Sequence, residues 1–171
     1  MSARTFVSVE MGLQSFDEDI LVWMRRGHTA AQSIKAIEQI SKACPAVNLG
    51  VHLIFGGPKE TDAMAIEAAH KINALPVHNV KLHHLHVLKD TPLAEEYARG
   101  EFQPLEREVY FQRCCLFLQH LRPDIAVHRL SAFAPRWDEL IAPAWTSFRM
   151  KTYQDMLGFM HERGAFQGQN V

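Results

Sequence analysis

The chain has 171 residues, of which 47% are hydrophobic, and its 18 basic and 19 acidic side chains leave a formal net charge of −1. A chain of this length can bury one core of its own, because single domains commonly contain about 100 to 200 residues. The balanced charge gives no field that would attract nucleic acid or an anionic membrane. No apolar segment approaches the roughly 20 residues of a membrane span and no signal peptide is recognisable, so we expect a cytoplasmic protein without a membrane partner.

Four segments combine apolar and β-branched residues in the manner of strands. In chain order they are residues 5–11, 48–55, 79–88 and 125–130. Helical segments lie between them, so units of strand and helix repeat along the chain. Such repeats predict an α/β fold of parallel strands joined by right-handed crossovers, with helices packed on the sheet.

The helices carry recognisable start signals. Thr29 and Gln32 have the spacing of a capping box, Thr61 is an expected N-cap, and Thr91 precedes a proline at the tolerated first position of a helix. A short helix is expected to end at Arg25-Arg26. The longer helices are expected over residues 29–42, 63–75, from 92, 105–121 and 147–162. Together these elements predict one domain over residues 1–163 and a flexible tail over residues 164–171.

The cysteines give no sign of a disulfide framework or of a metal site. There are three, Cys44, Cys114 and Cys115, which is an odd number, and their spacing fits no CxxC motif. We therefore expect reduced thiols and assign no metal ligand.

Polar residues fall where the predicted strands end. In parallel α/β folds the functional groups gather at the carboxyl ends of the strands. The residues that fall there are Glu10, Gln14, His52, His84, His86 and Lys89, together with the Gly56-Gly57-Pro58 turn.

Five blocks of sequence carry a resemblance to a known family. In order they are VEMGLQS, RRGHT, VHLIFGGPKET, KLHHLHVLKDTPLAEEY and VHRLSAFAPRWDELIAPAW. The chain resembles the C-terminal half of a radical SAM protein of the YhcC-like group, whose core is similar to the Elongator catalytic subunit. The resemblance implies the C-terminal half of a partial (βα)6 barrel with a C-terminal helical extension. It also implies S-adenosylmethionine and a 4Fe-4S cluster as cofactors, and reductive cleavage of the former to a 5′-deoxyadenosyl radical.

The resemblance also implies roles for residues of the cofactor site. Gln14 would bond the ribose or methionyl part of S-adenosylmethionine, Glu10 would face the same pocket, and Arg26 would pair with the methionine carboxylate. The alternatives are structural: a strand-end carboxylate salt-bridged to a neighbouring helix for Glu10, and polar groups at helix ends for Gln14 and Arg26.

Two further parts of the cofactor site follow from the same pattern. His52 would border the cavity, and the backbone at Gly56 and Gly57 would approach the cofactor closely. A hydrogen-bonded core histidine and a plain tight turn are the alternatives.

Four residues are candidates for substrate binding, and no catalytic residue is assigned. His84 and His86 would line the cavity, while Lys89 and Arg129 are cations at strand ends that would otherwise be solvated. A rival hypothesis is a metal hydrolase in which His84, His86 and His52 bind zinc.

The sequence departs from the family at one decisive point. It lacks the CxxxCxxC loop that holds the cluster, and its three cysteines cannot replace that loop. The main hypothesis is therefore a C-terminal portion of a radical SAM enzyme that contributes to the cofactor and substrate site but does not bind the cluster alone. A non-catalytic fragment that binds S-adenosylmethionine or a partner is the second hypothesis.

The missing half has consequences for partners. The first strand begins near Met1, so its edge would be unpaired and apolar surface would be left uncovered. We expect a marginally stable chain that self-associates or pairs with an N-terminal half encoded by an upstream reading frame. The likeness to the Elongator subunit raises RNA as a partner, but the charge gives that hypothesis no independent support.

Overall fold

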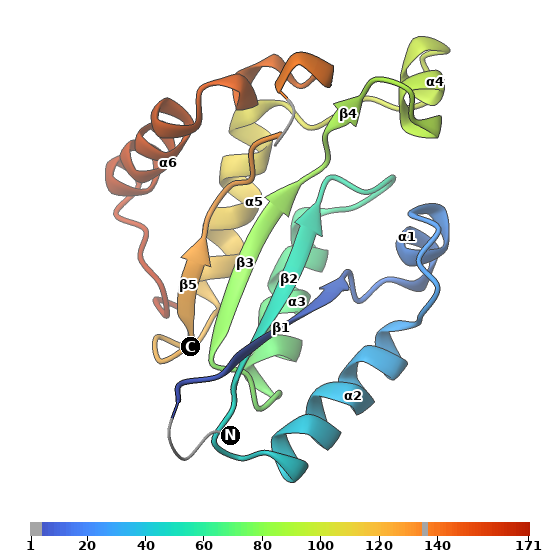
Figure 1. The fold of residues 1–171 in the computed structure, drawn as a ribbon. Helices are drawn as coiled ribbons and strands as arrows, with labels where there is room; N and C mark the ends of the chain where they lie inside the picture. Colours follow the sequence, from blue (N-terminus) through green and yellow to red (C-terminus); the bar gives the residue numbers. More distant parts are fainter. Residues whose placement is uncertain (1–4, 135–136) are drawn as a thin grey trace.

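A four-stranded parallel sheet is the centre of the computed structural model, which describes residues 5–134 and 137–171 (Figure 1). The strand order is β1-β2-β3-β5. The strands are β1 (Ser8–Gln14), β2 (Asn48–Phe55), β3 (Asn79–His84) and β5 (Ala126–Arg129). All three pairings are parallel, which confirms the α/β class predicted from the repeating units. Residues 1–4 and 135–136 of the expected domain lie outside the described part.

Three helices supply the apolar layer of the core: α2 (Ala30–Ala43), α3 (Asp62–Asn73) and α5 (Arg107–Gln119). Figure 1 shows α3 and α5 behind the sheet. The expected caps are present, because the hydroxyl groups of Thr29 and Thr61 accept from the third backbone amide of α2 and α3, respectively. Alternate side chains of β2, such as Val51 and Leu53, are buried against this layer.

The remaining elements lie beyond the carboxyl ends of the strands and at the side of β5. They are α1 (Glu18–Trp23), β4 (Val87–Leu88), α4 (Pro92–Ala98), η1 (Trp137–Glu139), β6 (Leu140–Ala142), η2 (Ala144–Ser147) and α6 (Arg149–Glu162). The predicted strand over residues 79–88 is two strands, because β4 leaves the main sheet and pairs antiparallel with β6. The helical C-terminal extension is confirmed by α6.

The first strand lies later in the chain than the sequence predicted. It was expected over residues 5–11, but pairing with β2 begins at Ser8 opposite Asn48 and continues to Gln14 opposite Leu53. Pairing with a neighbour decides strand limits more strongly than the β-branched residues at its start. As a result Glu10 lies within the strand rather than at its end.

Residues 164–171, expected to be a flexible tail, run back along the molecule. The amides of Gly168 and Asn170 donate to the carbonyls of Leu118 and Gln119 at 3.0 and 2.8 Å. The tail therefore contacts the end of α5.

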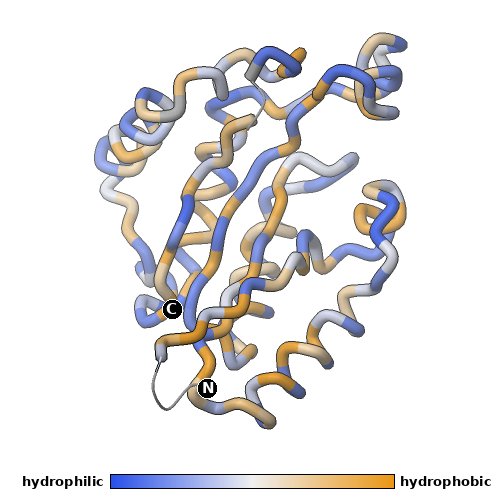
Figure 2. Tube along the Cα trace, viewed as in Figure 1, coloured by the Kyte–Doolittle hydropathy of each residue, from blue (hydrophilic) through white to orange (hydrophobic). Residues whose placement is uncertain are grey.

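The face of the sheet opposite α3 and α5 carries no helix within the described residues, as Figure 1 shows. Figure 2 shows hydrophilic and hydrophobic residues alternating along β3, as expected for a strand with one buried and one open face. None of the helices in the described ranges is long and apolar enough to cross a membrane.

Candidate functional site

Arg26 and Gln14 come together above a glycine at the end of β1. Gln14 has a φ of +68°, a conformation that is uncommon for a residue with a side chain, and the pairing with β2 shifts between Met11 and Gln14. The glutamine side chain then lies over Gly12, where an added Cβ would collide with its Nε2 and lie 3.3 Å from Nη2 of Arg26. Gly12 thus leaves room for the Gln14 side chain in this position, which a larger residue would displace, and the sequence analysis missed it.

The guanidinium group of Arg26 is free to bind a ligand. It is exposed and forms no ion pair or side-chain hydrogen bond with another residue in the described part of the chain. A planar guanidinium without a partner suits a bidentate carboxylate. The structure therefore places Gln14 and Arg26 close together and leaves Arg26 available, while their contact with the cofactor stays a prediction.

A groove of about 280 Å³ begins beside Arg26, and its wall is mainly apolar. It is lined by Trp23, Met24, Arg25, Arg26, Ile54, Leu85, Thr91, Pro92, Leu93 and Glu96. These residues come from α1, α4 and the carboxyl ends of β2 and β3, which is the edge where ligands bind in parallel α/β sheets. We call it the α1–α4 groove.

The glycine turn after β2 is fixed by a buried ion pair. Gly56 adopts a φ of +108°, and its amide donates to the Glu60 carboxylate at 2.6 Å. Arg113 of α5 pairs with the same carboxylate at 2.7 Å, and both side chains are 6% exposed. Burial raises the pKa of Glu60, while the Gly56 amide and Arg113 act against this rise. Gly57 packs so closely on α1 that a Cβ would lie 2.8 Å from Ile20. The local structure thus explains why a glycine occupies each position. Close approach of the Gly56 and Gly57 backbone to a cofactor stays a prediction.

Glu10 is the centre of a polar network on the open face. Its carboxylate pairs with Lys81 at 2.5 Å and with Nε2 of His52 at 3.1 Å, and His128 lies 3.8 Å away. The hydrogen bond from Lys81 is the main reason that the pKa of Glu10 is lowered to about 2, and His52 adds to the effect. Glu10 is therefore ionised at neutral pH. It is salt-bridged, as the structural alternative expected, but to residues of other strands and not to a helix.

His83 and Arg129 extend this network across the sheet. Nη1 of Arg129 donates to Nε2 of His83 at 3.4 Å, and the His83 ring stacks on His52 at 5.2 Å between ring centres. Burial and the charge of Arg129 lower the pKa of His83 to about 4. We refer to these residues as the open-face cluster: Glu10, His52, Lys81, His83, His128 and Arg129.

His84 and His86 lie on the other side of β3. Their Nε2 atoms are 3.0 Å apart, but His84 is only 4% exposed and packs on Tyr110 and Trp145. Burial lowers the pKa of His86 to about 4 and that of His84 well below its usual value, so both rings are neutral.

The alternative zinc site is wrong. Successive strand residues point to opposite faces, and His52 stacks on His83 rather than approaching His84. No group of three suitable ligands exists within residues 5–134 and 137–171. Lys89 is exposed, and its backbone amide donates to Glu139, so its predicted contact with substrate stays a prediction.

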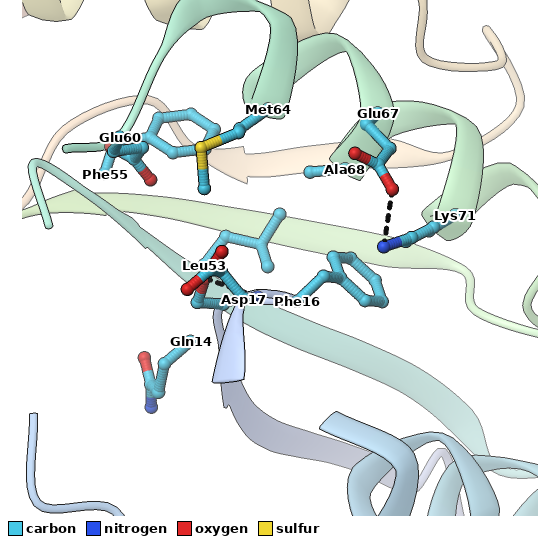
Figure 3. Close-up of a pocket in the computed structure, with 11 residues that line it drawn as sticks. Gln14, Phe16, Asp17, Leu53, Phe55, Glu60, Met64, Glu67, Ala68 and Lys71 are labelled. Carbon is cyan, nitrogen blue, oxygen red and sulfur yellow. Dashed lines mark hydrogen bonds and ion pairs between the residues drawn. The ribbon is translucent and has the colours of Figure 1, made fainter. Parts of the chain in front are cut away.

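A further cavity of about 200 Å³, also lined by Gln14, lies between the end of β1 and α3 (Figure 3). Its lining includes Phe55 and Met64, and at one end Glu67 pairs with Lys71, whose ammonium lies 5.4 Å from the Phe16 ring centre. Its lining belongs to the helix-covered side of the sheet, away from the open-face cluster.

The described cysteines do not fit a 4Fe-4S cluster. Cys44 is exposed at the end of α2, whereas Cys114 and Cys115 are buried in α5. Burial raises the pKa of both α5 thiols, and cluster ligands must be thiolates that converge on one point. The chain as described therefore has no ligand set for the cluster.

Sequence reasoning missed Lys81, His83 and His128 as members of the site. A signal was present, because Lys81 and His83 are two residues apart in a strand that is otherwise apolar or buried. Only the strand order, which places β3 between β2 and β5, brings these residues to Glu10.

Comparisons with known proteins agree with this geometry. A family model described as the radical SAM superfamily matches residues 2–72, and one described as the radical SAM C-terminal domain matches residues 77–159. YtqA of Bacillus subtilis is 29% identical over 168 residues, and YhcC of Escherichia coli is 28% identical over 159 residues. The matches cover 98% and 93% of this chain but 51% and 50% of those proteins, so the chain spans about half the length of these relatives.

A solved structure and a match over a shorter segment extend the comparison. The structure of Methanocaldococcus infernus Elp3 with an N-terminal deletion aligns with a TM-score of 0.74 at 20% identity, over 94% of this chain and 37% of that chain. A tRNA uridine(34) acetyltransferase of the same organism is 31% identical over 103 residues, which is 58% of this chain and 19% of the enzyme.

Proposed function

Because this chain belongs to the radical SAM superfamily, we propose that it forms the part of a radical SAM enzyme that binds S-adenosylmethionine and faces the substrate. The matches to YhcC and Elp3 confirm the resemblance read from the five sequence blocks. That this chain binds S-adenosylmethionine is a proposal, and so are its substrate and its reaction.

The observation that carries the proposal is the free guanidinium group of Arg26, held above Gly12 beside Gln14. Arg26 would bind the methionyl carboxylate through its planar fork, and the Gln14 amide would orient the cofactor with one hydrogen bond. The apolar wall of the α1–α4 groove, with Trp23 and Leu93, would cover the adenine ring. The cofactor supplies radical chemistry when it is bound next to a reduced 4Fe-4S cluster, and this chain would position it and exclude water.

Calorimetric titration with S-adenosylmethionine tests the binding role. We expect saturable binding that Arg26→Gln weakens at least tenfold, because one bidentate ion pair is lost. Arg99→Gln is the matched control, since Arg99 pairs with Glu101 on the surface and does not line the groove. Absence of binding, or equal affinity in both variants, would contradict the proposal.

We further propose that the free edge of β1 accepts the half of the fold that carries the cluster. Within the described residues β1 pairs only with β2, and Phe6 just before it is 79% exposed. A groove of about 320 Å³ beside this edge is lined by residues that include Met11 and Ala36. An unpaired edge next to exposed apolar surface favours addition of a strand.

The partner role is tested by reconstitution. The chain would be mixed with a polypeptide that supplies the preceding βα units and a CxxxCxxC loop, then loaded with iron and sulfide and reduced. We expect 5′-deoxyadenosine from the mixture and none from either polypeptide alone. A mixture that holds the cluster but leaves S-adenosylmethionine intact would contradict this role.

A further inference from the structure

The open-face cluster contains more cationic groups than its carboxylate can balance. Glu10 is its one acidic member, and Lys81 already pairs with it. Arg129 forms no ion pair with a carboxylate of the described residues, and its contact is the nitrogen of a neutral histidine at 3.4 Å. A half-buried guanidinium without a carboxylate partner is costly, so a bound anion would stabilise this face.

The groups around Arg129 belong to two neighbouring strands of the open face. Arg129 is the register partner of Lys81 on the neighbouring strand, and His83 follows Lys81 by two residues on the same face. His128 adds a further ring at the exposed edge strand. Strands lie about 4.8 Å apart, so side chains from β3 and β5 can reach one bound group together.

An anion bound on this face would change the hydrogen bonding of His83 directly. Burial is the main cause that keeps the ring neutral, and the positive charge of Arg129 adds to it. An anion placed between His83 and Arg129 would replace the weak contact between them with two charge-assisted hydrogen bonds.

We propose that the open face binds a phosphate group of the substrate between Arg129, His83 and His128. This inference rests on the proposed function, because the same face would line the reaction chamber. Phosphate is favoured over carboxylate because the side chains available to one ligand come from two strands. A tetrahedral group has acceptor oxygens for Arg129, for a protonated His83 and for His128 at once, whereas a carboxylate is filled by one guanidinium fork. The substrate would therefore be a phosphorylated compound, such as a nucleotide or a nucleic acid.

Titration of the full chain with inorganic phosphate tests this inference, with the imidazole proton resonances of His83 followed by NMR. We expect saturable shifts at millimolar phosphate, a rise of at least one unit in the pKa of His83, and at least tenfold weaker effects with acetate. Arg129→Gln should weaken phosphate binding at least tenfold, whereas Arg99→Gln, on the exposed Arg99–Glu101 pair, should leave it within twofold.

A second variant should change the affinity for phosphate in the opposite direction. Glu10→Gln removes the competing carboxylate and releases Lys81 and His128, so phosphate should bind several times more tightly. Far-UV circular dichroism would confirm that both variants fold.

Three outcomes would overturn the inference: no saturable binding, equal affinity for acetate, or unchanged affinity in Arg129→Gln. The outcome is separable from that of the proposed function. Phosphate binding without S-adenosylmethionine binding would remove the cofactor role alone, and the reverse result would remove the phosphate site alone.

Discussion

The ion pair between Arg113 and Glu60 is expected to be a large single contribution to the stability of the fold. Arg113→Met removes the 2.7 Å pair, a bond of 3.1 Å to the Glu60 carbonyl and a 3.4 Å contact with Asp62. It leaves a carboxylate that is 6% exposed and bonded by the backbone amides of Gly56 and Gly57. Breaking a buried pair in this way costs about 3 to 5 kcal/mol, and we expect about 3 because Glu60 can take up a proton.

The pH dependence follows from the raised pKa of Glu60. A carboxyl group whose pKa is higher in the folded state stabilises the fold below its unfolded value of 4.5 and loses that contribution as pH rises through the folded pKa. Removing Arg113 raises the folded pKa further. The difference in unfolding free energy between Arg113→Met and the unchanged chain should therefore be larger at pH 7 than at pH 5.

Urea unfolding followed by circular dichroism at these two pH values measures the effect. Arg99→Met is the matched control, because the Arg99–Glu101 pair has the same 2.7 Å length but side chains 53% and 54% exposed. It should unfold like the unchanged chain. The double variant Arg113→Met with Glu60→Gln should recover at least half of the loss. A loss below about 1 kcal/mol at pH 7, or a loss independent of pH, would refute the reasoning.

Three further outcomes are expected. Gly12→Ala should displace the Gln14 side chain and weaken S-adenosylmethionine binding at least tenfold in calorimetry, with little change in melting temperature; unchanged affinity would show that Gly12 does not set the site. Tyr110→Phe removes a buried 2.7 Å hydrogen bond to the Leu130 carbonyl and should cost about 1 to 2 kcal/mol in urea unfolding, whereas a neutral result would mean that the carbonyl finds another donor. Because the pKa of Glu10 is lowered to about 2, its contribution should be present above pH 4.5 and lost as pH falls toward 2, and acid titration of Glu10→Gln should show a shallower decline over that window.

Much of the candidate site was predictable from local sequence, because strand ends and helix ends are marked by short-range signals. Gln14 and Arg26 were expected to bind a ligand, and the structure places both side chains beside Gly12. His84 and His86 were expected on one face of a strand, and the structure places their Nε2 atoms 3.0 Å apart, while their contact with substrate stays a prediction. The prediction that His52 is a zinc ligand together with His84 and His86 was wrong, because the face on which a strand residue lies depends on the register of the whole strand.

The sequence by itself determined the repeating α/β pattern, the capped starts of α2 and α3, and the absence of a cluster-binding cysteine motif, because each depends on residues close together in the chain. Tertiary structure decided which distant residues share a face. Glu10, Lys81 and His128 are separated by 71 and 47 residues and become neighbours only through the strand order. It also decided where β1 lies and that β4 leaves the sheet to join β6. These features depend on pairing between strands, whose energy is set by the partner strand and not by local sequence.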